Sequence, residues 1–166
     1  MKTEFKAKFL QHVAKKRKEE GFTLIELLVV IIIIGILSAI ALPSFLNQAN
    51  KAKQSEAKQY LASINKGQQS YYVGSGKFII NLSSIDQLGL GIKTATSNYT
   101  YNLGGDANGT NVASAWTEAA AGSLRGYAGL SFLKDVAGSS EKTSETALCE
   151  GPAGAALTTP AATDCS

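Results

Sequence analysis

The sequence is poor in the residues that most enzymes use for chemistry. Its 166 residues include one histidine, His12, and two cysteines, and no set of potential ligands has the spacing of a metal site. It also offers no nucleophile–base pair, no phosphate-binding loop and no suitably placed pair of carboxylates. We therefore expect no catalytic site, no bound metal and no cofactor, and the composition argues against an ordinary cytosolic enzyme.

Charge is scarce and unevenly distributed. Only 17% of the residues are charged, and residues 1–21 contain seven Lys or Arg against three Glu, a net charge of +4. The remaining chain contains nine basic and ten acidic residues, a net charge of −1. Because the basic excess lies in one short N-terminal segment, the overall basicity does not indicate nucleic-acid binding.

Charge is missing altogether between Leu27 and Asn50. Residues 27–42 are apolar except for Gly35 and Ser38, and Phe22–Ile25 extend this run toward the N-terminus. Together they form about 20 apolar residues, which is enough to cross ~30 Å of hydrocarbon as a helix. The sequence therefore predicts a transmembrane helix.

The alternative is a buried helix of a soluble core. It is less favourable because the run Val29–Ile34 makes the helix apolar on all sides, whereas a helix at the surface of a soluble core has one polar face. The basic residues at 15–18 place the N-terminal side in the cytoplasm and the C-terminal bulk outside.

The expected processing site precedes the apolar run. No Ala-x-Ala cleavage site follows the run, as a secretory signal peptide would require. Cleavage between Gly21 and Phe22 would instead remove the charged leader, residues 1–21, and retain the apolar stem. The mature protein would then be anchored in the membrane rather than released.

Glu26 is the one ionisable residue inside the apolar segment. A buried charge in a membrane is costly without a partner, so Glu26 is a candidate functional residue. After cleavage, the α-amino group of Phe22 would lie one helical turn away, and Glu26 could neutralise the Phe22 amine of a neighbouring copy. The alternative is a carboxylate that is favoured by the helix dipole and reaches the lipid interface.

The segment Gly21-Phe22-Thr23-Leu24-Ile25-Glu26, followed by an apolar run, resembles the prepilin signature (class III signal peptide) of type IV pilins and pseudopilins. The resemblance implies that a prepilin peptidase cuts after Gly21 and N-methylates Phe22. It also implies that Gly35 to Pro43 loosens when subunits pack, because proline disrupts helices and glycine weakens them; tolerated membrane residues are the alternative. The leader ending at residues 15–21 is similar to that of cyanobacterial major pilins.

The expected fold is α+β, with a long N-terminal helix packed on a small antiparallel sheet. The helix should run from Phe22 to about Val73, roughly 78 Å, with an apolar part at 22–50 and an amphipathic part at 51–73. Its packing face is expected to contain Ala57, Tyr60, Leu61, Ile64, Gln68 and Tyr71.

Residues 74–166 are expected to form the αβ loop, the sheet and a C-terminal loop. Gly74-Ser75-Gly76 should end the helix, and a short helical turn is expected at Ser83–Leu88. Alternating residues indicate three strands, and the head is expected to contain three or four antiparallel strands in all. The Ser/Thr/Ala-rich tail from Gly138 is expected to be loop. The expected strands are Ser97–Leu103, Asn111–Glu118 and Leu124–Leu133.

Cys149 and Cys165 are the only cysteines, and both are expected outside the cytoplasm. In an oxidising compartment, two such cysteines indicate one disulfide, which would close a C-terminal loop of about 15 residues. In pilins the equivalent loop holds the C-terminus to the sheet, and type II secretion pseudopilins commonly lack this bridge.

We therefore expect a structural subunit of a type IV pilus, a retractable fibre for motility, adhesion or DNA uptake. Its partners would be further copies of itself, minor pilins, the prepilin peptidase, and the assembly platform with its motor ATPases. Before assembly the subunit would lie in inner-membrane lipid. The alternatives are a type II secretion pseudopilin or a minor pilin and, more remotely, a membrane-anchored binding module.

Overall fold

The computed structural model describes residues 22–154 of the chain. The chain divides into two compact units, residues 1–46 and residues 47–166, which we describe separately. A single helix, α2 (Leu24–Ser75), contributes to both units. It begins and ends within two residues of the predicted positions and continues through Pro43.

The first unit consists of the N-terminal part of α2. Among the described residues, α2 is the one helix long and apolar enough to cross a membrane, and none of its most apolar 18-residue stretch is buried. The large side chains of this part are 44–80% exposed, from Leu28 to Leu24. This part of the helix therefore carries no protein core of its own.

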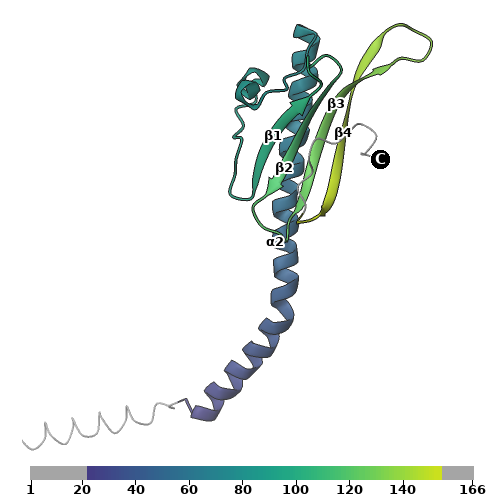
Figure 1. The fold of residues 1–166 in the computed structure, drawn as a ribbon. Helices are drawn as coiled ribbons and strands as arrows, with labels where there is room; N and C mark the ends of the chain where they lie inside the picture. The colour runs from purple at the N-terminus through teal and green to yellow at the C-terminus, as the bar shows by residue number, and fades with distance from the viewer. Residues whose placement is uncertain (1–21, 155–166) are drawn as a thin grey trace, which may run out of the picture. The chain divides into compact units, whose positions relative to one another are not determined.

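The second unit is an α+β head, in which the C-terminal part of α2 lies along one face of a four-stranded antiparallel sheet (Figure 1). The sheet order is β1-β2-β3-β4, so each strand pairs with its neighbour in the sequence. The fold class expected from the sequence is confirmed. The strands are β1 (Tyr99–Gly105), β2 (Val112–Ala119), β3 (Arg125–Asp135) and β4 (Lys142–Ala153).

The head core forms between the helix and the sheet. Most of the predicted helix face is buried, including Ala57, Leu61 and Ile64, while Tyr60 and Tyr71 are half-buried. Ala57, Leu61 and Ile64, with Tyr60 packed against them, belong to one cluster with aromatic residues of the sheet and with Ile85. The sheet side of the cluster is formed by Tyr99, Tyr101, Ala115, Leu124 and Tyr127.

The fourth strand corrects the prediction of a loop after Gly138. β4 pairs with β3 along most of its length, from Asp135 opposite Lys142 to Arg125 opposite Ala153. Only Cys149 and Gly151 of this strand are buried, and most of its other side chains are small or polar. An edge strand of this composition lacks the apolar alternation that identifies β1–β3 from the sequence.

A second apolar cluster lies on the sheet face that points away from the helix. Ala128 and Leu130 of β3 are fully buried there, next to Cys149 of β4. Trp116 and Phe132 are half-buried against this cluster rather than exposed.

The connection from α2 to β1 contains the short 3-10 helix η1 (Leu82–Leu88), close to the predicted helical turn. Gly76, with φ +67°, ends α2 by donating its N–H to the carbonyl of Tyr72. The buried amide of Gln68 then fixes the start of the connection, because it donates to the Ile79 carbonyl at 2.6 Å and accepts from the Ile79 N–H at 2.8 Å.

Candidate processing and assembly site

Glu26 and Thr23 form a hydrogen-bonded cap at the N-terminus of α2. The Glu26 carboxylate accepts the Thr23 N–H at 2.8 Å and the Thr23 hydroxyl at 2.6 Å. The Glu26 N–H in turn donates to the Thr23 hydroxyl oxygen at 3.3 Å. This is a capping box, in which two side chains satisfy helix N–H groups that have no intrahelical partner.

The cap keeps the carboxylate close to the predicted new N-terminus. Phe22 immediately precedes Thr23 and is 74% exposed, so its backbone lies beside the cap and its ring is free of the fold. Gly21 and the leader, residues 1–21, lie outside the described residues. The role of Thr23 was not predicted from the sequence, although the spacing Thr-x-x-Glu is the signal for such a cap.

Gly35 and Pro43 both lie within the continuous α2. A Cβ atom at Gly35 would meet nothing within 4 Å, so no close contact requires glycine there. Proline has no N–H to donate, which removes one hydrogen bond from the helix at Pro43. The segment that is predicted to loosen, Gly35 to Pro43, is therefore helical in the isolated chain.

The Glu150 carboxylate of β4 links Lys58 of α2 to Arg125 of β3. Lys58 Nζ and Arg125 Nη1 each lie 3.0 Å from a different oxygen of the Glu150 carboxylate. The hydrogen bond between Lys58 and Glu150 lowers the pKa of the carboxyl and raises the pKa of the amine. Lys58 Nζ also lies 5.0 Å from the centre of the Tyr127 ring.

Cys149 lies in β4 opposite Ala128 and is 7% exposed. It belongs to the apolar cluster on the outer sheet face. Cys165 lies outside the described residues, so the predicted pairing of the two cysteines stays a prediction.

The described residues thus combine an exposed apolar helix, capped through a carboxylate, with an α+β head. Comparison with known proteins gives the family. Residues 54–165 match the family described as Type IV pilin-like G and H, and residues 16–42 match the prokaryotic N-terminal methylation motif. The chain belongs to the type IV pilin family and carries a class III signal peptide.

Three curated proteins illustrate the similarity. Fimbrial protein EcpC of Eikenella corrodens is 38% identical over 69% of this chain and 72% of its own length. Type IV major pilin protein PilA of Myxococcus xanthus is 49% identical over 33% of this chain and 25% of its own length. Type II secretion system core protein G of Aeromonas hydrophila is 30% identical over 45% of this chain and 52% of its own length. The chain thus spans a quarter of one relative and about half of another.

Proposed function

We propose that the protein is a structural subunit of a type IV pilus, processed after Gly21 and polymerised through the apolar part of α2. The observation that carries this proposal is the exposed apolar helix of the first unit, whose side chains contact no core. The match to the pilin family supports it. The role is structural rather than enzymatic, and it requires no cofactor.

The apolar helix needs a partner of low polarity. Exposed apolar surface costs about 25 cal/mol per Å² in water. A contiguous apolar patch that extends along a whole helical segment marks a contact with a membrane or with another protein. Inner-membrane lipid would cover the helix before assembly, with the head outside the cytoplasm and the basic residues 15–18 on the cytoplasmic side. Helices of neighbouring copies would cover it in the extracellular fibre.

Glu26 would set the register between neighbouring copies. Cleavage after Gly21 creates a cationic amine at Phe22, and N-methylation leaves the amine able to keep its charge. In the single chain the carboxylate is bound by Thr23, through hydrogen bonds of 2.6 and 2.8 Å. We expect assembly to add the Phe22 amine of a neighbour to this carboxylate, because an ion pair between copies offsets the cost of burying both charges.

Local loosening of α2 between Gly35 and Pro43 would accompany packing of the helices. The missing N–H at Pro43 and the weak helix propensity of glycine lower the cost of opening this segment relative to its neighbours. In the head, a disulfide between Cys149 and Cys165 would close the C-terminal loop. For a loop of about 15 residues, such a bond contributes ~3 kcal/mol of stability.

The proposed partners in the cell are the prepilin peptidase, minor pilins and an assembly platform driven by motor ATPases. The resulting fibre would be retractable and would serve motility, adhesion or DNA uptake. A secretion pseudopilin or a minor pilin is the second candidate, favoured by the similarity to type II secretion system core protein G. Cys149 and Cys165 favour the pilin, because pseudopilins commonly lack this bridge.

The first test is mass measurement and N-terminal sequencing of protein sheared from the surface of native cells. We expect an abundant chain that begins with methylated Phe22 and is about 2 Da lighter than its dithiol form. Protein that remains entirely with the cells would favour the pseudopilin. A sheared fibre whose subunits keep residues 1–21 would contradict the processing and assembly mechanism.

The second test replaces Glu26 with alanine. We expect normal membrane insertion and processing of the Glu26→Ala chain but little or no sheared fibre, because the neighbour's amine loses its partner. Glu141→Ala is the matched control, since it removes an exposed carboxylate of the head. Normal amounts of Glu26→Ala fibre would refute the pairing of Glu26 with Phe22.

A further inference from the structure

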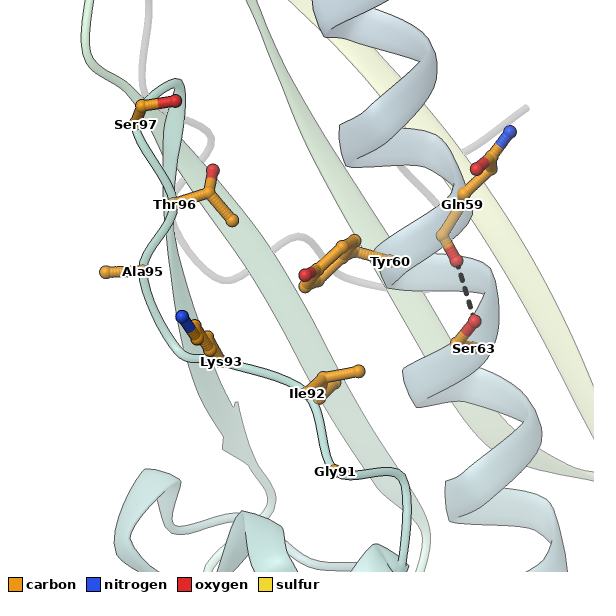
Figure 2. A pocket seen from close by; sticks show the side chains of 9 residues that line it. All are labelled: Gln59, Tyr60, Ser63, Gly91, Ile92, Lys93, Ala95, Thr96 and Ser97. Carbon is orange, nitrogen blue, oxygen red and sulfur yellow. Dashed lines mark hydrogen bonds between the residues drawn. The ribbon is translucent and has the colours of Figure 1, made fainter.

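An open groove lies in the head between α2 and the segment that precedes β1. It has a volume of about 710 Å³, within the range of roughly 300–1,000 Å³ that is typical of ligand sites. Figure 2 shows one wall formed by α2 and the opposite wall formed by residues 91–97. The lining residues are Gln59, Tyr60, Ser63, Gly91, Ile92, Lys93, Ala95, Thr96 and Ser97.

The outer wall is fixed to the sheet. The Tyr101 N–H donates to the Thr94 carbonyl, and the Thr96 N–H donates to the Tyr99 carbonyl, both at 2.8 Å. The segment turns into the groove at Gly91, whose φ of +60° favours glycine over other residues. These backbone contacts hold the wall open beside the helix, so the groove is part of the fold.

Apolar groups gather at the centre of the groove. Tyr60 reaches from α2 toward the outer wall, where Ile92 and the methyl group of Thr96 flank it (Figure 2). The Tyr60 ring is supported from behind by Tyr101, with ring centres 4.9 Å apart and planes 17° apart. The hydroxyl of Thr96 is occupied by the N–H groups of Asn98 and Tyr99, which leaves its methyl group to face the groove.

A polar group also lies directly behind this platform. The Tyr101 hydroxyl is buried and has no hydrogen-bond partner in the described part of the chain. Burial raises the pKa of Tyr101, and so do the nearby Glu56 and Tyr60, so the phenol stays protonated and able to donate.

The rim of the groove carries donors and one positive charge. Ser97 and Lys93 are exposed and contribute a hydroxyl and an ammonium group, whereas the Gln59 amide points away from the outer wall (Figure 2). None of the lining residues is acidic, and Lys93 forms no ion pair within residues 22–154. A bound cation would therefore find no anionic ligand here, whereas an anion would find a partner in Lys93.

We propose that this groove binds an acidic saccharide, with the apolar face of a sugar ring against Tyr60 and Ile92 and its carboxylate at Lys93. A sugar ring combines an apolar face with hydroxyl groups around its edge. That pattern matches an aromatic platform with hydroxyl groups at its edge better than a flat hydrophobic ligand does. The carboxylate would bind Lys93 through a charge-assisted hydrogen bond.

The test uses the full chain in detergent micelles and three probes. These are a tetrasaccharide of alternating glucuronic acid and N-acetylglucosamine, neutral maltotetraose, and a tetraglutamate peptide. Amide chemical shifts should change at Ser63, Lys93 and Ser97 with the acidic saccharide. Binding of maltotetraose and of tetraglutamate should each be at least about tenfold weaker, a difference of ~1.4 kcal/mol.

Variants test whether the saccharide binds at this groove or is attracted only by the overall surface charge. Lys93→Gln should weaken binding of the acidic saccharide about tenfold. Lys66→Gln, which removes an exposed lysine of α2 outside the groove, should have no effect. Shift changes located elsewhere, equal binding of tetraglutamate, or unchanged affinity of the Lys93→Gln chain would overturn the proposal.

Discussion

Gly129 lies where a side chain of the helix packs directly on the sheet. It is buried in β3 opposite Leu148, and the side chain of Asn65 from α2 lies directly over it. A Cβ atom at Gly129 would lie 2.8 Å from Asn65 Oδ1 and 3.0 Å from Nδ2. The substitution Gly129→Ala must therefore displace this amide.

The cost follows from what the amide does. Asn65 Nδ2 donates to the Ala147 carbonyl at 3.1 Å, and Asn65 Oδ1 accepts the Ser131 hydroxyl at 3.4 Å. Losing two such hydrogen bonds costs about 1–3 kcal/mol, and overpacking a core costs a further ~1–3 kcal/mol. The two costs do not add in full, because the movement that breaks the hydrogen bonds of the amide also relieves the overpacking. We therefore expect Gly129→Ala to destabilise the head by about 2–4 kcal/mol.

The assay is denaturant unfolding of the full chain in micelles, followed by the fluorescence of Trp116, the single tryptophan of the chain and a residue of the sheet. Gly122→Ala is the control, because a Cβ atom there meets nothing within 4 Å. In the double variant Gly129→Ala with Asn65→Ala, the new methyl group has space, so the two effects should fall short of their sum by at least ~1 kcal/mol. A loss below about 0.5 kcal/mol for Gly129→Ala, or additive effects, would refute this packing.

Three further changes test other contacts. Gln68→Met should lower the free energy of unfolding by about 2–4 kcal/mol, because it leaves the buried N–H and carbonyl of Ile79 unpaired; an unchanged denaturation midpoint would contradict the role of this amide. The folded-state pKa of Glu150 is lowered by Lys58, so its contribution is full above the unfolded-state pKa of about 4.3 and is lost as pH falls through the folded value. Between about pH 5 and 3, the wild-type chain should thus lose more stability than the Glu150→Gln chain. The difference should be at most ~1 kcal/mol for each exposed ion pair. Parallel curves of stability against pH for the two chains would argue against a stabilising role of Glu150. Gly21→Val should block maturation, so that immunoblots of membranes contain only the precursor; efficient processing would refute the cleavage site.

The sequence predicts the elements whose residues alternate or recur clearly. The apolar run and the spacing of Ala57, Leu61 and Ile64 predict α2, because burial on one side imposes helical periodicity. The strands β1–β3 follow for the same reason, since each contributes to a buried face. β4 escaped prediction because only Cys149 and Gly151 of this strand are buried and most of its other side chains are small or polar, so it shows no apolar alternation.

The functional contacts also include some that the sequence predicts and some that it does not. Glu26 and Phe22 are recognisable because a charge inside an apolar run is rare, and this signal lies within a few consecutive residues. The contact of Glu150 with Lys58 and Arg125 joins residues up to 92 positions apart. It depends on the pairing of β3 with β4, which includes a register shift between Arg125 and Tyr127. No local pattern contains that information.

If the subunit lies in the membrane before it assembles, as proposed, the cap at Glu26 stabilises the carboxylate during that stage. A carboxylate without partners would be costly there, but Thr23 already supplies two hydrogen bonds within the same chain. Under the proposed mechanism, a neighbour's amine therefore has to improve on an existing set of contacts. Thr23→Ala should raise the cost of the unassembled state, whereas Thr23→Ser should preserve the cap. If fibre assembly by the two variants is identical, the Thr23 hydroxyl has no part in holding the carboxylate ready.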